Sequence, residues 1–231
     1  IENGWITLES TVDELAQTIA IDGERLSCAT QPEPLRNPDF GDVLHFGCPY
    51  PVMELVVANG ADAYNEIITA FSLVQPIDAE LQDEGGVVQP LETKRELGMA
   101  GIGQATLTIT PLQLARAFAT VGTEGASPEI RLVDAVRLSG GEWVQYEDSD
   151  PSKQVLHADT VAQIRSALGT DNHFGYEALA IAGESLGWYL GGVRGLTGNY
   201  VIVVVLEGGL SSEAARIGER LLESVQTSSI P

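Results

Sequence analysis

The side chains best suited to nucleophilic chemistry are few and poorly spaced in this chain. Cys48 follows His45 by three residues, so a thiol–imidazole pair can be considered. No acidic or amide residue that could orient the imidazole is identifiable, which favours a buried or disulfide-bonded Cys48 beside a loop histidine. No serine is followed by lysine three positions later, and Ser185 has no lysine or histidine near it in the sequence. Ser149 precedes Lys153 by four positions, but in an acidic stretch that is typical of a loop.

Metal chemistry is not indicated either. Cys28 and Cys48 lie twenty positions apart, and the histidines are scattered, so zinc-site spacing is absent. A Cys28–Cys48 disulfide and a pair of buried thiols both remain open. Two acidic groups lack the residue order of a calcium-binding loop and favour solvated loops, namely Asp78, Glu80, Asp83 and Glu84, and Glu142, Glu147, Asp148 and Asp150. We therefore expect no metal and no cofactor.

Charge and hydropathy narrow the function further. The 231 residues include 33 acidic and 12 basic side chains, for a formal net charge of −21. A broad cationic surface for nucleic acid or for an anionic membrane is therefore not expected. A hydrophobic fraction of 44% is enough for a folded core. The chain begins with Ile1 rather than Met, and we interpret it as a processed or excised segment of a longer polypeptide.

The first half of the chain has helical patterns. Pro51 opens one helix that ends at Asn59-Gly60, and Ala61–Phe71 is typical of a second. The clearest helix start is Thr110-Pro111-Leu112-Gln113, which has an N-cap threonine, a first-turn proline and a glutamine at the third position. Further helices are predicted over Asp159–Leu168 and Glu213–Val225.

The second half is richer in strands. Three β-rich runs are joined by glycine-containing connections, namely Leu179–Ala182, Gly187–Val193 and Tyr200–Leu206. A hairpin is predicted from Glu129–Leu138 through Gly140-Gly141 into Trp143–Tyr146. Helices followed by a sheet and a terminal helix indicate the α+β class. We treat residues 1–231 as one partial domain, with residues 1–128 mainly helical or loop and residues 129–231 holding the sheet and the terminal helix.

One segment carries a specific resemblance. Residues 101–119 read GIGQATLTITPLQLARAFA. This stretch resembles the G-x-G-Q-x-x-L-x-x-T-P-L-Q-x-A-x-A-[YF]-A sequence of penicillin-binding protein transpeptidase domains. With that anchor the resemblance extends over nearly the whole chain. Ile1–Gly4 then looks like the end of the nucleophile helix, and Ile181–Leu190 looks like the active-site strand.

The family relies on three motifs, S-x-x-K, S-x-N and K-[ST]-G. The resemblance places the first shortly before Ile1, so it is either cut off or was never present. The second falls on Gly47-Cys48-Pro49, which offers neither a hydroxyl nor a side-chain amide. The third falls on Glu184-Ser185-Leu186, where only Ser185 conforms and Glu184 reverses the charge of the expected lysine. We predict that these six positions are degenerate, and we assign no catalytic residue.

The resemblance implies an α+β, β-lactamase/transpeptidase-like fold. In that family the sheet has five strands, and two of them precede the nucleophile helix, so both strands and that helix are expected to be absent here. The remaining strands are predicted at Ile181–Leu190, Gly192–Thr197 or its neighbours, and Tyr200–Glu207. The hairpin Glu129–Tyr146 is expected to pack nearby. The exposed sheet edge is expected to pair with another chain, which makes a homo-oligomer a candidate state.

The implied setting is extracytoplasmic cell-wall peptidoglycan assembly, with membrane anchoring through a segment not present in this chain. Peptidoglycan stem peptides or other wall-synthesis proteins are the expected partners. Because the motifs are degraded, the first hypothesis is a non-catalytic binding or scaffolding domain. The second is an active D,D-transpeptidase whose serine lies upstream of Ile1. The third is a structural domain whose role is to assemble a multidomain protein.

Overall fold

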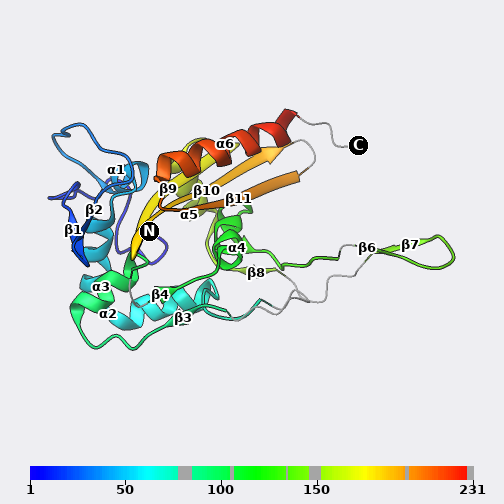
Figure 1. Cartoon of the computed structure of the whole chain (residues 1–231), viewed down its shortest axis with the longest axis horizontal. Coiled ribbons are helices and arrows are strands. Elements are labelled where there is room, and N and C mark those ends of the chain that lie inside the picture. The colour runs from blue at the N-terminus through cyan, green and yellow to red at the C-terminus, as the bar shows by residue number, and fades with distance from the viewer. Residues whose placement is uncertain (78–84, 105–106, 134, 146–151, 196–197, 228–231) are drawn as a thin grey trace.

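The computed structural model describes residues 1–77, 85–104, 107–133, 135–145, 152–195 and 198–227 (Figure 1). Its largest sheet is antiparallel, with strand order β11-β10-β9. The three strands are β9 (His173–Ala182), β10 (Glu184–Gly195) and β11 (Gly198–Glu207). This arrangement confirms the α+β class and the three-stranded antiparallel sheet.

The strand boundaries differ from the prediction. Ile181–Leu190 is not one strand, because the chain turns at Gly183, whose φ is 79°, and starts β10 at Glu184. Gly192 is not in a separate strand either, since it belongs to β10 and pairs with Val201. A glycine that supplies positive φ for a tight turn is the physical reason for the break. The prediction also missed the first half of β9.

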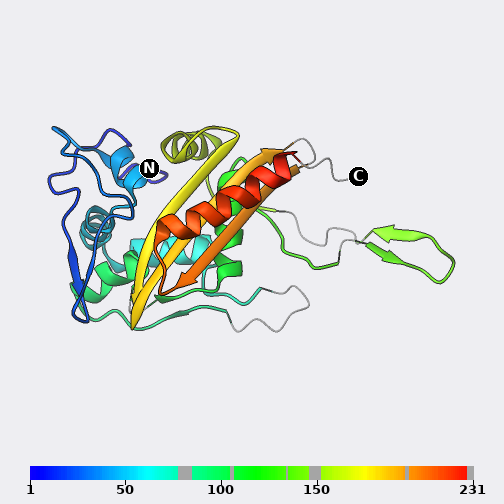
Figure 2. The same ribbon diagram turned by 45° about the horizontal axis from the view of Figure 1, so that its top comes forward.

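Helices cover both faces of the sheet. The C-terminal helix α6 (Ser211–Thr227) lies along one face, and α4 (Pro111–Gly122) and α5 (Ala158–Leu168) lie on the other (Figure 2). Side chains of β11 alternate between these two layers, because successive residues of a strand point to opposite faces. This explains why the run from Val201 to Val205 is apolar throughout.

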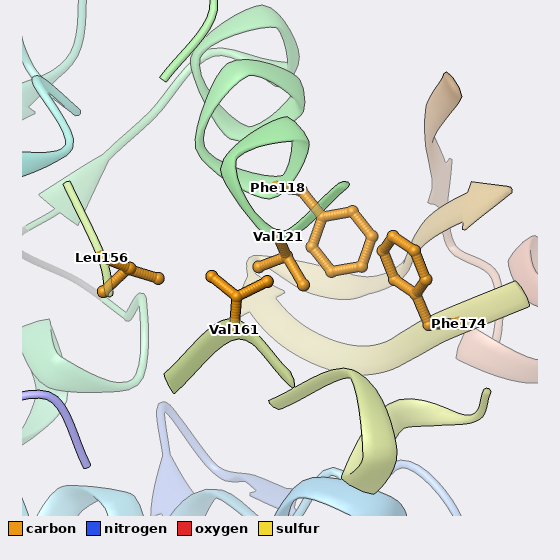
Figure 3. Packing of buried hydrophobic residues seen from close by; sticks show 5 residues of the cluster. All are labelled: Phe118, Val121, Leu156, Val161 and Phe174. Atoms are coloured by element: carbon orange, nitrogen blue, oxygen red, sulfur yellow. The ribbon is translucent and has the colours of Figure 1, made fainter. Parts of the chain in front are cut away.

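The core between α4, α5 and the sheet is small and aromatic. Phe118 and Val121 from α4 meet Val161 from α5 and Phe174 from β9, with Leu156 closing one side (Figure 3). The Phe118 and Phe174 rings are 5.6 Å apart between centroids. The predicted cap of α4 is confirmed, because Thr110 Oγ1 accepts from the Gln113 N–H and Gln113 Oε1 accepts from the Thr110 N–H. This core spans residues on both sides of position 128, and the division there stays a prediction.

The N-terminal part supplies the other helices. Its elements are β1 (Ile19–Ile21), β2 (Glu24–Leu26), α1 (Phe40–Phe46), α2 (Pro49–Ala70) and α3 (Lys94–Gly101). Helix α2 begins two residues before the predicted Pro51, because Cys48 is the extended N-cap residue and Pro49 takes the first helical position. The predicted break at Gly60 is confirmed, since its φ of 86° interrupts the helix.

The smaller strands pair locally. Strands β3 (Val87–Val88) and β4 (Leu107–Thr108) form one pair, and β5 (Ala126–Ser127) and β8 (Lys153–Gln154) form another. The predicted hairpin exists as β6 (Ala135–Arg137) and β7 (Trp143–Gln145), shorter than expected. It does not pack near the sheet as predicted, and instead projects from the body of the molecule (Figures 1 and 2). Trp143 is accordingly 67% exposed.

Candidate functional site

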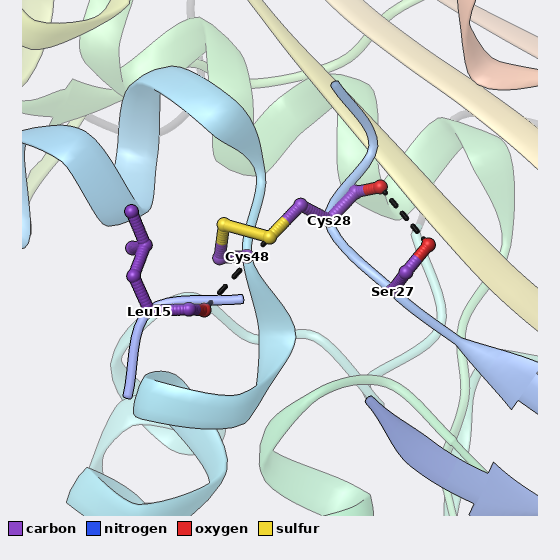
Figure 4. The surroundings of a disulfide bond; sticks show 4 residues. All are labelled: Leu15, Ser27, Cys28 and Cys48. Carbon is purple, nitrogen blue, oxygen red and sulfur yellow. Dashed lines mark hydrogen bonds between the residues drawn. A yellow bond between two sulfur atoms is a disulfide. The ribbon is translucent and has the colours of Figure 1, made fainter. Parts of the chain in front are cut away.

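The residues that the resemblance assigns to the second motif lie at the junction of α1 and α2. Gly47 ends α1 in the left-handed conformation, with φ 59° and ψ 48°. Cys48 is fully buried and forms a disulfide with Cys28 (Figure 4). The disulfide alternative is therefore the one that the structure contains. The thiol–imidazole pair with His45 is excluded, because a bridged sulfur is neither a nucleophile nor an acid.

The backbone of Gly47 packs directly on strand β9. A Cβ atom built on Gly47 would overlap the carbonyl oxygen of Glu177 and would lie 3.0 Å from the Cβ of Ala29. Position 47 therefore has no room for a side chain as the chain is arranged. A serine hydroxyl, which the family motif supplies, does not fit here without a shift of the backbone.

The residues that the resemblance assigns to the third motif lie elsewhere, on the sheet. Glu184 and Ser185 are exposed at the start of β10, just after the turn at Gly183. Glu184 pairs with Ala182, five residues along β9 from Glu177. At about 3.3 Å per residue this is a separation of about 17 Å. The structure therefore does not bring Gly47-Cys48-Pro49 together with Glu184-Ser185-Leu186, and Gly47 faces the middle of β9 instead.

The edge of β9 that faces away from β10 is contacted by Gln104 of the glycine-glutamine segment. Gln104 is 1% exposed, and its Oε1 accepts a hydrogen bond of 3.0 Å from the Ile181 N–H. Because backbone groups alternate in direction along a strand, the N–H groups of Leu179 and Glu177 also point away from β10. We call the backbone groups of these three β9 residues the β9 outer edge.

A polar cluster on the other side of β9 was missed by the sequence analysis. His173 Nε2 lies 2.6 Å from Glu219 Oε2, and the Tyr189 hydroxyl donates to the other oxygen of Glu219. Burial raises the pKa of Tyr189, and the carboxylates of Glu219 and Glu177 raise it further. No short-range sequence pattern indicates this cluster, because its residues are brought together only by the pairing of β9 with β10 and by the packing of α6 on the sheet.

An apolar cavity of about 760 Å³ lies beside the N-terminus. Its lining includes Ile1, Trp5, Phe40, Val43, Tyr64 and Phe71. Burial raises the pKa of Tyr64 to about 12, so its hydroxyl stays neutral. The cavity presents little that could activate a nucleophile, and it is suited to apolar side chains.

The described parts of the chain also bear on the other predicted sites. They contain no group of three or more histidine, cysteine, aspartate or glutamate side chains placed to hold a metal ion. Asp78, Glu80, Asp83 and Glu84 lie outside the described residues, as do Glu147, Asp148, Ser149 and Asp150, while Glu142 is exposed. No helix within the described residues has the length and apolar character needed to cross a membrane.

Fold and motif define the class of protein. The family model for the penicillin binding protein transpeptidase domain matches residues 1–216, so the chain belongs to that family. The Peptidoglycan D,D-transpeptidase PbpA of Mycolicibacterium smegmatis is 26% identical over 150 residues. That match covers 64% of this chain and 28% of the relative.

Solved structures agree on the fold. Penicillin-binding protein A from M. tuberculosis, as a penicillin G acyl-enzyme complex, has a TM-score of 0.80 at 21% identity and covers 95% of this chain and 56% of its own. The D,D-transpeptidase domain of a peptidoglycan glycosyltransferase from Eggerthella lenta has a TM-score of 0.78 at 17% identity, covering 98% and 62%. The chain thus spans less than two thirds of these relatives, and the likeness shows the fold alone.

Proposed function

We propose that this chain is a non-catalytic penicillin-binding-protein domain that binds or scaffolds other components during peptidoglycan synthesis. The observation that carries the proposal is the Gly47–Glu177 contact, which leaves no space for the hydroxyl of the second motif. Without that hydroxyl the family's proton relay lacks one of its members. Pro49 likewise lacks both a side-chain amide and a backbone N–H with which to hold a substrate carbonyl.

Charge supports the same proposal. In the sequence register of the third motif, Glu184 stands where the family has lysine. Glu184 is exposed and lies about 17 Å along β9 from the Gly47–Glu177 contact, so the lysine's attraction for a substrate carboxylate is missing there. The net charge of −21 disfavours an anionic substrate further at longer range.

The proposal includes a location and partners. The named relatives act in peptidoglycan synthesis, so we place this domain outside the cytoplasm, anchored through a segment beyond this chain. A peptidoglycan stem peptide or another wall-synthesis protein is the proposed partner. A purely structural domain, whose role is to assemble a multidomain protein, is a separate third hypothesis in which no peptide is bound.

One observation favours a second candidate, an active D,D-transpeptidase. The resemblance places the nucleophile segment shortly before Ile1, and the apolar cavity is lined by Ile1, Glu2 and Asn3. An apolar helix immediately upstream would have a complementary surface to pack on. In this candidate the serine and lysine come from that helix.

Covalent labelling separates the two candidates. The full-length protein that carries this chain is incubated with a fluorescent penicillin, denatured, and examined for label by gel fluorescence and intact mass. The non-catalytic proposal predicts no covalent adduct, whereas stoichiometric acylation at a serine would establish the active candidate. Protein denatured before incubation serves as the control for non-specific label.

A further inference from the structure

The segment that follows β2 lies across the second-motif position. We call Cys28–Thr30 the strap. The Ala29 N–H donates to the Gly47 carbonyl at 3.2 Å, and the Thr30 N–H donates to the Phe46 carbonyl at 3.1 Å. The Cys28–Cys48 disulfide adds a covalent link beside these two hydrogen bonds (Figure 4). The strap is therefore fixed to the α1–α2 junction along its whole length.

The strap also contacts the start of α6, and the residues before it pack against β9. The Ser211 hydroxyl, at the start of α6, lies 3.5 Å from the Ala29 carbonyl oxygen. Leu26, just before the strap, is 1% exposed and belongs to a cluster against which Leu179 and Ile181 of β9 pack. Gly47 consequently lies between the strap on one side and Glu177 on the other.

The space beside the β9 outer edge determines whether an extended peptide can pair with it. A strand added to a sheet lies about 4.8 Å from its neighbour. The Gly47 backbone already occupies this space beside Glu177, because even one added carbon there would overlap the Glu177 carbonyl oxygen. Gln104 occupies the Ile181 N–H, so that of Leu179 is left between two positions that are already covered. An extended peptide therefore has no continuous row of partners on the β9 outer edge.

We propose that the strap is an internal block, which holds the Gly47 turn against Glu177 and closes the β9 outer edge to an incoming extended peptide. The peptide concerned is a stem peptide ending in D-Ala-D-Ala, and this choice rests on the proposed function. Strand addition provides affinity through main-chain hydrogen bonds, so a blocked edge forfeits most of that affinity. Loosening the strap restores it.

Two variants loosen the strap by different routes. Thr30→Pro removes the N–H that donates to Phe46 and leaves the disulfide in place. Thr30→Ala is its matched control, because it keeps that N–H. The double variant Cys28→Ser with Cys48→Ser removes the covalent link and leaves both backbone hydrogen bonds. Near-ultraviolet circular dichroism and thermal melting establish that each variant is folded.

Binding is measured by fluorescence anisotropy with a fluorescein-labelled peptide ending in D-Ala-D-Ala, and its location by amide chemical shifts. We expect roughly tenfold tighter binding to Thr30→Pro or to the double variant than to wild type or Thr30→Ala. We also expect shifts at Glu177 and Leu179, whose N–H groups point outward, and smaller ones at Ala178.

Equal affinity in wild type and in a folded loosened variant would overturn the block while leaving a peptide-binding function standing. An absence of binding to every folded variant would also overturn it. Neither result depends on acylation, which tests the proposed function separately with penicillin.

Discussion

The carbonyl oxygen of Glu177 occupies the place where a side chain on Gly47 would begin. Gly47 also has a φ of 59°, which costs an L-residue about 1–2 kcal/mol. Overpacking adds about 1–3 kcal/mol. We therefore expect Gly47→Ser to lower the free energy of unfolding by about 2–5 kcal/mol, measured by urea titration, and not to create penicillin acylation.

Gly23→Ser is the matched control for this substitution. Gly23 has a φ of 91°, but a Cβ there would meet nothing within 4 Å. Gly23→Ser should therefore lower the free energy of unfolding by less than Gly47→Ser does, and the difference should equal the overpacking contribution. Equal losses at the two positions would contradict the close contact between Gly47 and Glu177.

Gln104 provides a second test of the β9 edge. Replacing it with alanine leaves the part-buried Ile181 N–H without its acceptor, which costs about 1–3 kcal/mol. Gln104→Ala should therefore lower the urea midpoint, whereas alanine at the exposed Gln163 should leave it unchanged. A Gln104→Ala variant as stable as wild type would show that the Ile181 N–H finds another partner.

Packing around Tyr189 predicts an unusual response on helix α6. A Cβ on Gly218 would overlap the Tyr189 ring. Alanine is favoured over glycine in helices by about 1 kcal/mol, but overpacking opposes this with about 1–3 kcal/mol. We expect Gly218→Ala to lower the melting temperature, while Arg220→Ala on the exposed side of α6 changes it little. A higher melting temperature for Gly218→Ala would contradict this packing.

The N-terminal segment should make stability depend on pH. Glu2 accepts hydrogen bonds from the His157 N–H at 3.1 and 3.2 Å, and His157 Nδ1 lies 2.6 Å from its Oε1. Desolvation alone would raise the pKa of Glu2, but hydrogen bonds from Thr160 and His157 outweigh it and lower the pKa below its usual value of 4.5. Glu2 therefore contributes stability above pH 4.5, and this contribution is lost as the pH falls through the lowered pKa.

Glu2→Gln is the variant that checks this pH dependence. Wild type should be more stable than Glu2→Gln at pH 7, and the difference should shrink towards pH 3 in urea titrations. A difference that is constant with pH would contradict the assignment.

The outer edge of β11 is the proposed site of self-association. Within the described strands, β11 pairs only with β10, and residues 200–206 carry no charge. An uncharged open edge invites pairing with a second copy. We expect dimer formation in sedimentation equilibrium, weakened by Val203→Lys but not by Val136→Lys on the projecting hairpin. A monomer at all concentrations would contradict this edge as an interface.

Local signals predicted much of the fold. Thr110, Pro111 and Gln113 specify the start of α4 through side chains that bond within the same helical turn, so no tertiary information was needed. The positions of long-range partners could not be read in this way. The turn at Gly183 depends on β9 pairing with β10, and the contact between Gly47 and Glu177 depends on how α1 packs on the sheet. The projecting hairpin lacks a packing partner, which its alternating pattern did not reveal.

The central claim is that this domain lacks transpeptidase chemistry. The most direct measurement is release of the terminal D-alanine from a stem peptide ending in D-Ala-D-Ala by the full-length protein, followed by chromatography and intact mass. The account predicts no release above the uncatalysed rate and no acyl adduct. Release that depends on the folded protein, with an acyl adduct on a serine, would contradict it.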